Sequence, residues 1–418
     1  MNTLDPNLDR SSDRNPDHDP ERGAGAREAR PRHTFRRVAL VVLVALLLIV
    51  LALARPGYRY ARAAGLLLRI ESPQHPGLIG GIHTYAVEES LTTIRTPAGP
   101  IRARRYLPKG TANPPGMVIV HGVHHLGIEE PRLVAFARAM SASGILVLTP
   151  ELSSLADYQV DAHSIDLIGC AARDVAQSLH QKVGVLGISF GGGLSLLAAA
   201  DPRYERYIRF VLSVGAHDDL ERVSEFFITN QIARPDGTTL EMPAHQYGPL
   251  VLIYSHVGDF FPPAEVPAAH EAMRQLLWER VDESRKEAEH LSPASRAKME
   301  LLYKQHVETL AKEIQQVIGE HHADMTAVSP HGRLRSLRVP VLLLHGSADN
   351  VIPPSELLWL ERDVPPADLV AALISPVLSH VSLEGKPTLA DNWRLVSFMA
   401  KMLELVDDRQ YSPPRPMT

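Results

Sequence analysis

From about residue 80 onward, short apolar runs alternate with segments of helical pattern. The runs are almost free of polar residues, which is typical of strands covered by helices on both faces. They predict an α/β fold in which a mainly parallel sheet is flanked by helices. Six runs have this character: 117–120, 145–148, 183–186, 210–214, 339–344 and 369–374. Two earlier runs, 91–95 and 101–107, enclose the turn residues 97–100 and predict an antiparallel hairpin.

The alternation of predicted strands and helices is interrupted by one long insertion. About 120 residues separate Gly215 from Val339, whereas a crossover between parallel strands needs only a dozen or so. Within this stretch, residues 264–320 are charged and predict two or three helices, interrupted at Ser292-Pro293. We expect residues 216–335 to form a helical cap over the C-terminal edge of the sheet. The two parts of the core are then 81–215 and 336–407, and a disordered tail follows at 408–418.

The N-terminal segment has a different character. Residues 1–37 contain eight arginines and seven acidic residues but almost no large apolar side chains, so they predict a disordered tail. Residues 38–54 are seventeen consecutive apolar residues. As a helix they would reach about 26 Å, near the low end of a bilayer span. This run predicts a transmembrane helix that anchors the chain, followed by a linker at 55–80.

A cleaved signal peptide is the main alternative to the anchor, because Ala52-Leu53-Ala54 has the small-x-small form of a cleavage site. The long preceding tail and the length of the apolar run favour an uncleaved, single-pass anchor. Arginines lie on both flanks of the run. Their distribution modestly favours a cytoplasmic tail and a main body on the exported, non-cytoplasmic side of the membrane.

Composition excludes some classes of function and one type of cross-link. The chain has 418 residues, 45% hydrophobic and 22% charged, with a formal net charge of -5. This balance provides no basic face, so we expect no nucleic-acid partner. The only cysteine is Cys170, which excludes an intramolecular disulfide. Its apolar helical neighbourhood predicts a buried small hydrophobic residue rather than a reactive thiol.

The most specific chemical pattern is Gly187-Ile188-Ser189-Phe190-Gly191, which lies between a buried strand and an apolar helix. A sharp turn between them requires glycine at positions where a side chain would collide. Such a turn lifts the Ser189 hydroxyl above the sheet at a helix N-terminus, where the backbone N–H of Phe190 faces developing negative charge. Ser195 lies within the helix and is expected to pack rather than react.

A serine nucleophile needs a histidine base that a carboxylate holds in the correct tautomer. Asp349 follows one buried strand and His380 follows the next, so both loops leave the same edge of the sheet as Ser189. Ser189, Asp349 and His380 are therefore the predicted catalytic residues. Asp218 and Asp219, which follow the preceding strand, are the alternative acids.

The strand at 117–120 leads into His121-Gly122-Val123, where a second oxyanion donor is expected. The backbone N–H of Val123 is the predicted donor, and one such hydrogen bond stabilises the transition state by roughly 3–4 kcal/mol. His121 is expected to order this loop rather than to react.

The pairs His124-His125 and His321-His322 could suggest a metal, but we expect adjacent histidines to point apart. Neither a cysteine ligand set nor an H-E-x-x-H segment accompanies them, and no nucleotide-binding glycine motif is present in the sequence. The sequence therefore predicts neither metal nor cofactor.

Together these segments resemble the α/β-hydrolase superfamily, specifically its esterase/lipase-like serine hydrolases. The resemblance covers roughly residues 90–405 apart from the insertion and implies acyl transfer to water through an acyl-serine intermediate. It implies that Ser189 attacks the acyl carbon, His380 shuttles the proton and Asp349 orients the imidazole. The long charged insertion has no counterpart in the family's pattern.

The sequence thus favours a membrane-anchored hydrolase acting on a small-molecule carboxylic ester or a lipid-like acyl substrate. The same triad also serves peptidases, thioesterases and acyltransferases. A catalytically silent α/β-hydrolase fold used as a binding protein is the alternative from another class. The intact set of Ser189, Asp349 and His380 argues against it.

Overall fold

The computed structural model describes residues 32–378 and 387–408, except for the side chains of 32–37, 39 and 46–56. The chain divides into two compact units, Met1–Arg55 and Pro56–Thr418. The first helix, α1 (Arg32–Glu71), crosses this boundary. Among the described residues, no helix is both long enough and apolar enough to cross a membrane. The side chains of 39 and 46–54, within the predicted anchor at 38–54, lie outside those described.

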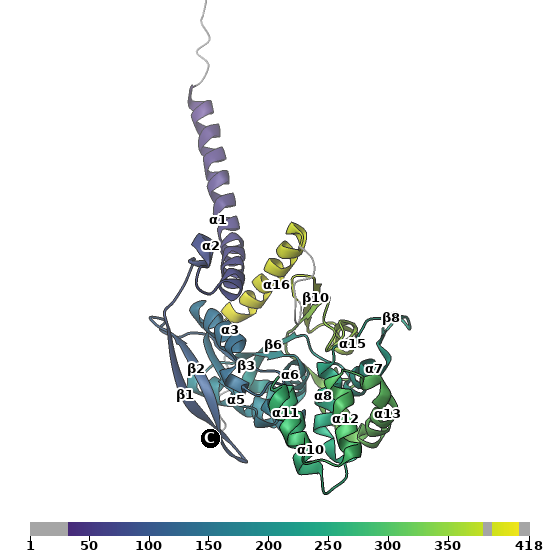
Figure 1. The fold of residues 1–418 in the computed structure, drawn as a ribbon. Helices are drawn as coiled ribbons and strands as arrows, with labels where there is room; N and C mark the ends of the chain where they lie inside the picture. Colours follow the sequence, from purple (N-terminus) through teal and green to yellow (C-terminus); the bar gives the residue numbers. More distant parts are fainter. Residues whose placement is uncertain (1–31, 379–386, 409–418) are drawn as a thin grey trace, which may run out of the picture. The chain divides into compact units, whose positions relative to one another are not determined.

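The larger unit contains an eight-stranded sheet in the order β1-β2-β4-β3-β5-β6-β9-β10 (Figure 1). The first two strands form the predicted hairpin, in which Ile94 pairs with Ile101, and β2 continues antiparallel to β4. The remaining neighbours are parallel, and each of the six predicted apolar runs forms one of these strands. The bounds are β1 (Val87–Thr96), β2 (Gly99–Pro108), β3 (Gly116–Val120), β4 (Leu146–Pro150), β5 (Val183–Ile188), β6 (Ile208–Val214), β9 (Val341–Gly346) and β10 (Leu369–Ser375).

Helices cover both faces of the sheet, as the near-continuous apolarity of its strands requires. One face is buried against α3 (Pro131–Ala142), α16 (Leu389–Asp407) and the second half of α1. The other face is buried against α5 (His163–Leu179), α6 (Phe190–Ala200) and α15 (Ser355–Asp363). Cys170 lies in α5 and is fully buried, as predicted. Two short helices complete the core, α2 (Gly77–Gly80) and α4 (Ser153–Ala156).

The segment from 55 to 71 is helix, not the predicted linker. Ala63 and Leu66 are fully buried against the sheet face covered by α3 and α16. Arg62 forms an ion pair of 2.6 Å with Asp407, and Arg69 donates to Ser143 Oγ at 2.7 Å. These arginines are almost fully buried. Charged residues on the buried face make the helix look exposed in the sequence, because the partners that stabilise them lie far away in the chain.

The insertion runs from the end of β6 to the start of β9 and is mainly helical, as predicted, although residues 264–320 form four α-helices rather than two or three. Figure 1 shows α10, α11, α12 and α13 grouped together in green. Ser292-Pro293 begins a helix, because the Ser292 hydroxyl accepts from Ser295 N and Pro293 occupies the first helical position. The small hairpin β7–β8 was not predicted. The bounds are α7 (Leu220–Thr229), β7 (Gln231–Ala233), β8 (Thr239–Glu241), α8 (Tyr247–Ser255), α9 (Val257–Phe260), α10 (Val266–Leu277), α11 (Val281–Ala288), α12 (Pro293–Tyr303), α13 (Ala311–Glu320) and α14 (His322–Val328).

Candidate active site

Ser189 occupies the turn between β5 and α6. Its backbone lies at φ 56° and ψ -133°, a strained conformation for a residue with a side chain. Ser189 N donates to Val214 O at 2.8 Å, which fixes the turn to the neighbouring strand β6. The residue is 7% exposed. Backbone strain retained in a packed turn is typical of a functional position.

The glycines beside Ser189 are required by close contacts of the backbone. A Cβ on Gly187 would lie 2.3 Å from Gly191 O, and a Cβ on Gly191 would lie 2.6 Å from His121 O. The Ser195 hydroxyl donates to Gly191 O at 2.6 Å within α6, so it serves the helix backbone as expected. The sequence-based explanation of the turn therefore agrees with its geometry.

The loop after β3 passes directly beside the serine. A Cβ on Gly122 would lie 3.5 Å from Ser189 Oγ. The next residue, Val123, lines the same cavity as Ser189, and its N–H has no acceptor among the described residues. Phe190 is the first residue of α6, where a backbone N–H has no intrahelical acceptor. Both predicted oxyanion donors thus come from segments that adjoin Ser189.

His121 is buried and held from both ring nitrogens. Its Nδ1 lies 2.8 Å from Gly122 O, and Leu152 N donates to its Nε2 at 3.1 Å. Because burial disfavours the charged imidazolium, the pKa of His121 falls to about 4. The ring is therefore neutral near pH 7 and orders the loop, as predicted.

The insertion also supports this loop, through a residue that the sequence analysis missed. The Tyr247 hydroxyl, on α8, donates to Val123 O at 3.0 Å, and its ring lines the cavity that contains Ser189. No sequence pattern distinguishes Tyr247 from the other tyrosines of the insertion. His124 and His125 follow in the same loop, and their rings stack at 4.7 Å instead of pointing apart.

Asp349 lies in the loop after β9 and is 3% exposed. Its Oδ1 accepts from Val351 N and Ile352 N, each at 3.0 Å, and its Oδ2 lies 3.5 Å from His345 Nε2. These contacts fix the orientation of the carboxylate. Asp349 lines the same cavity as Ser189 and Val123, so three predicted site residues surround one space.

The predicted base, His380, lies outside the described residues. Leu378, the last described residue before it, lines the cavity with Ser189 and Asp349. On the far side, α16 begins with a capping box in which Thr388 and Asp391 exchange hydrogen bonds. The chain therefore leaves β10 at the cavity that contains Ser189.

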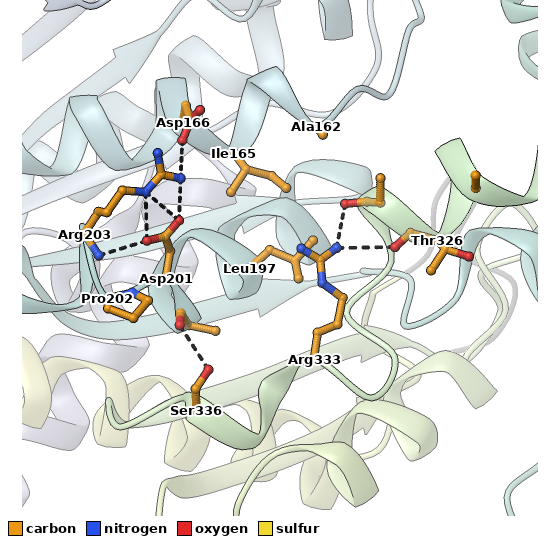
Figure 2. A pocket seen from close by; sticks show the side chains of 13 residues that line it. Ala162, Ile165, Asp166, Leu197, Asp201, Pro202, Arg203, Thr326, Arg333 and Ser336 are labelled. Carbon is orange, nitrogen blue, oxygen red and sulfur yellow. Dashed lines mark hydrogen bonds and ion pairs between the residues drawn. The ribbon is translucent and has the colours of Figure 1, made fainter.

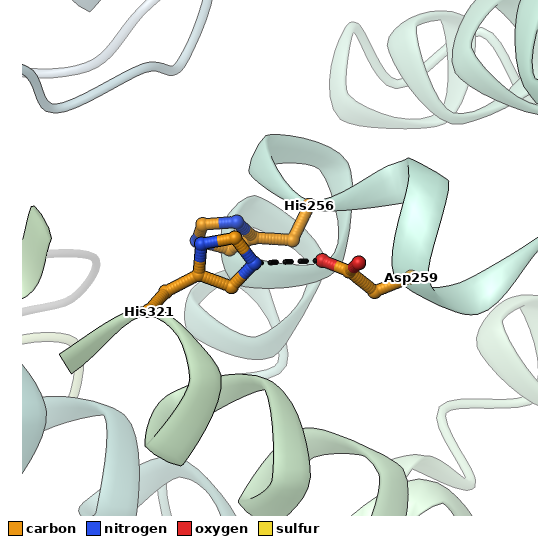
Figure 3. Close-up of side chains that lie close together, drawn as sticks. All are labelled: His256, Asp259 and His321. Atoms are coloured by element: carbon orange, nitrogen blue, oxygen red, sulfur yellow. Dashed lines mark hydrogen bonds and ion pairs between the residues drawn. The ribbon is translucent and has the colours of Figure 1, made fainter.

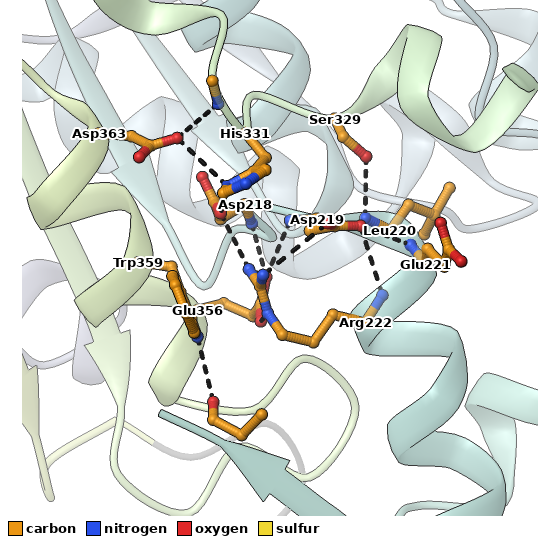
Figure 4. Close-up of polar contacts among 12 residues, drawn as sticks. Asp218, Asp219, Leu220, Glu221, Arg222, Ser329, His331, Glu356, Trp359 and Asp363 are labelled. Carbon is orange, nitrogen blue, oxygen red and sulfur yellow. Dashed lines mark hydrogen bonds and ion pairs between the residues drawn. The ribbon is translucent and has the colours of Figure 1, made fainter. Parts of the chain in front are cut away.

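Asp218, the alternative acid, belongs to a separate polar cluster (Figure 4). Arg222 donates to Asp218 Oδ2 at 2.9 Å and to Glu356 Oε1 at 2.7 Å, while His331 Nδ1 lies 3.0 Å from Asp218 Oδ2. Burial and the neighbouring Glu356 raise the pKa of Asp218 to about 7. Asp219 caps α7 by accepting from Glu221 N. These contacts hold the insertion against α15, and of the three predicted acids only Asp349 lines the cavity that contains Ser189.

The cavity beside Ser189 has a volume of about 770 Å³, within the range of about 300–1,000 Å³ for small-molecule sites. We call it the chamber. Three helices on one face of the sheet contribute apolar side chains to it. Glu130 and Arg132, which also line it, pair with each other at 2.7 Å. The apolar lining comprises Leu67 and Ile70 of α1, Leu133 and Phe136 of α3, and Leu395 and Met399 of α16.

A second cavity, of about 620 Å³, lies among α5, α6 and α14 (Figure 2). Its arginines are engaged within the protein. Arg203 pairs with Asp166 at 2.7 Å and with Asp201, while Arg333 donates to the carbonyl oxygens of Thr326 and Ala327. The described residues that line it include neither histidine nor cysteine. This cavity therefore offers no base beside a nucleophile.

Two groups of described residues place histidine and aspartate close enough to share a metal ion. One consists of Asp218, His331 and Asp363, but Arg222 already supplies a cation to Asp218 there. The other consists of His256, Asp259 and His321, within the insertion. Neither group includes residues of the chamber.

Comparisons with known proteins find similar solved structures but no matching family model. No family model and no curated protein matches the chain. A protein assigned as a hydrolase from Legionella pneumophila matches with a TM-score of 0.51 at 14% identity, over 79% of this chain and 93% of the other. The esterase domain of a Rhodothermus marinus protein matches with a TM-score of 0.39 at 15% identity, over 76% and 96%. A Pyrobaculum calidifontis esterase matches with a TM-score of 0.42 at 16% identity, over 82% and 90%.

Proposed function

Because the chain has the α/β-hydrolase fold, we propose that it is a serine hydrolase that cleaves a carboxylic ester through an acyl-serine intermediate. The observation that carries the proposal is the strained Ser189 turn beside the loop of Val123. A serine raised on such a turn, next to backbone N–H groups that can stabilise an oxyanion, suits nucleophilic attack on an acyl carbon.

In this mechanism Ser189 Oγ attacks the acyl carbon while His380 accepts its proton. The N–H groups of Val123 and Phe190 stabilise the oxyanion of the tetrahedral intermediate. His380 then protonates the leaving alkoxide, and the alcohol departs. Water activated by His380 attacks the acyl-serine, which releases the carboxylic acid and restores Ser189. Asp349 keeps the imidazole in the required tautomer and stabilises the imidazolium.

The chamber supports an ester whose acyl group is apolar. Its lining from α1, α3 and α16 is aliphatic or aromatic, and its charged pair Glu130–Arg132 is internally neutralised. Burying methylene groups against such a lining is favourable by about 0.8 kcal/mol each. An anionic or strongly polar acyl group would lose its hydrogen bonds to water and gain few from this apolar lining, so its burial would be unfavourable. We therefore propose lipid-like or medium- to long-chain acyl esters as the substrate class.

The test uses an activity-based fluorophosphonate, which phosphonylates activated serines. The full chain should be labelled at one site, and Ser189→Ala should abolish labelling. Ser195→Ala is the matched control, since Ser195 is a buried serine of the adjoining helix α6 with a purely structural hydrogen bond. Absence of labelling in folded wild type, or equal labelling of Ser189→Ala, would overturn the proposal.

A panel of oxygen esters, thioesters and peptide amides then separates the possible acyl substrates. Faster turnover of oxygen esters than of the matched thioesters or amides supports an esterase. Preferential cleavage of thioesters or peptides would retain Ser189 as nucleophile and change the substrate class. Transfer of the acyl group to an added alcohol in place of water would indicate an acyltransferase.

A further inference from the structure

The insertion contains two segments of the form His-x-x-Asp, at 256–259 and 321–324. The fold brings them together although Asp259 and His321 are 62 positions apart in the sequence. His256 immediately precedes α9, which contains Asp259. His321 lies between α13 and α14, and Asp324 falls in the first turn of α14. Two distant parts of the insertion thus present the same residue types at one point.

The side chains converge closely (Figure 3). His321 Nε2 lies 2.9 Å from Asp259 Oδ2, and the rings of His256 and His321 have centroids 4.0 Å apart. One ligand atom from each of His256, Asp259 and His321 lies within 4.8 Å of the others. Three such atoms are close enough to hold one metal ion, whose ligands lie about 2.0–2.2 Å from it when the metal is zinc.

The partners of these side chains favour a cation between them. The ring of His256 packs against the ring of His321, and among the described residues neither of its ring nitrogens has a hydrogen-bond partner. No lysine or arginine of the described chain pairs with Asp259 or Asp324. Two carboxylates therefore lie beside two imidazoles, and among the described residues no lysine or arginine pairs with either carboxylate.

Asp324 completes the arrangement. Its Oδ2 lies 3.6 Å from His321 Nδ1, on the opposite side of the ring from Asp259. A histidine that binds a metal through one nitrogen commonly directs the other N–H at a carboxylate, which fixes the tautomer and increases the basicity of the ligand. An ion pair alone would use one carboxylate, whereas His321 has one at each nitrogen.

We propose that His256, Asp259 and His321 bind one divalent transition-metal ion, with Zn²⁺ the best match, and that Asp324 orients His321. Two imidazole nitrogens and one carboxylate oxygen suit zinc, whereas calcium and magnesium require mainly oxygen ligands. The ion would join α9 to the α13–α14 junction. It lies apart from the chamber and takes no part in the acyl transfer, so this inference is independent of the proposed function.

The test begins with full-length protein stripped of metal by a chelator and dialysed. Calorimetric titration with Zn²⁺ should show one tight site per chain, and Zn²⁺ should raise the melting temperature. Co²⁺ at the same site should give the visible absorption of a low-symmetry complex. His256→Ala and His321→Ala should each weaken Zn²⁺ binding at least 100-fold and remove the thermal shift.

Asp259→Asn provides a second variant of nearly unchanged volume, so its folding can be matched to wild type by circular dichroism. Because it replaces a charged ligand with a neutral amide, it should weaken binding at least tenfold. His322→Ala is the matched control, because His322 adjoins His321 in sequence but pairs with Glu221 at 2.6 Å. It should bind as wild type does. No one-site binding by folded wild type, or unchanged binding by His256→Ala, would overturn the proposal and leave an ordinary histidine–aspartate ion pair.

Discussion

The hydroxyl of Tyr247 donates a 3.0 Å hydrogen bond to the carbonyl oxygen of Val123. This contact joins the insertion to the loop whose N–H is the predicted oxyanion donor. The position of that N–H relative to Ser189 therefore depends on a side chain outside the α/β core. Tyr247 acts through Val123 and is a positioning residue.

Replacing Tyr247 with Phe should lower kcat and leave KM nearly unchanged. A single neutral hydrogen bond contributes about 0.5–1.5 kcal/mol, which corresponds to a loss of roughly 2- to 13-fold. Steady-state kinetics on a chromogenic ester would measure it. Tyr254→Phe is the matched control on the same helix, since Tyr254 donates to Asp157 instead. Equal effects of the two substitutions on kcat would argue against the positioning role.

Asp349→Asn should lower kcat by about 10⁴-fold, because the amide supports the wrong histidine tautomer. Asp219→Asn, at the alternative acid, should leave kcat within about twofold of wild type, since Asp219 caps α7 and pairs with Arg222 away from the chamber. Single-turnover kinetics would separate acylation from product release. If the two variants exchanged these phenotypes, the acid would have been assigned to the wrong strand.

Ile70→Trp should shift the acyl-chain preference toward short esters by filling part of the chamber. Ile70 is only half-buried, so the protein should tolerate the larger ring. We expect kcat/KM for decanoyl esters to fall at least tenfold and that for acetyl esters to change less than twofold. Leu78→Trp, at a side chain 95% exposed, is the control. A uniform loss across all chain lengths would contradict the assigned acyl site while leaving Ser189 as nucleophile.

Asp218→Asn should change how stability depends on pH. The folded-state pKa of Asp218, about 7, lies above its unfolded value of about 3.9, so the native state binds more protons. Its contribution is present below about pH 4 and is lost as the pH rises to about 7, by at most about 1.4 kcal/mol per pH unit. Relative to wild type, the Asn variant should therefore gain stability over this window.

Urea denaturation at pH 5, 6 and 7 would measure the difference. Glu356, Arg222 and His331 face the same carboxylate, so the slope reports the whole polar cluster. A pH-independent difference between the two proteins would indicate that Asp218 is ionised throughout this range.

Gly191→Ala should destabilise the Ser189 turn, because the added Cβ would lie 2.6 Å from the backbone oxygen of His121. Overpacking of this kind costs about 1–3 kcal/mol. In contrast, Gly319→Ala in α13 meets no atom within 4 Å and should stabilise the protein by about 0.5–1 kcal/mol. Chemical denaturation of both variants tests the contrast. If both variants lost stability, the loss would not depend on the clash of the added Cβ with His121 O.

The sheet was predictable from sequence because its strands are buried on both faces, and burial of that kind leaves continuous apolar runs. The Ser189 turn was predictable for a similar local reason, since its glycines adjoin the serine in the chain. Ser292-Pro293 was correctly predicted as an interruption, because α11 ends at Ala288 and the serine–proline pair begins the next helix.

The features that sequence could not provide depend on partners far apart in the chain. The helix at 55–71 contains buried arginines whose partners include Ser143 and Asp407, so its pattern resembles an exposed linker. Tyr247 has no distinctive sequence context and acquires a role only beside Val123. The stacking of His124 on His125 likewise depends on a loop conformation that residue identity alone does not specify.

The ion pairs between α1 and α16 have a consequence for biosynthesis. Arg59 pairs with Glu404 and Arg62 with Asp407, so the first helix of the larger unit binds the last. At about 5–20 residues per second, the ribosome needs some tens of seconds to make α16 after α1. Until then, Ala63 and Leu66 lack part of their final packing surface. Folding of the larger unit is therefore complete only after α16 has been synthesised. A nascent chain that stalls earlier would expose apolar side chains to chaperones.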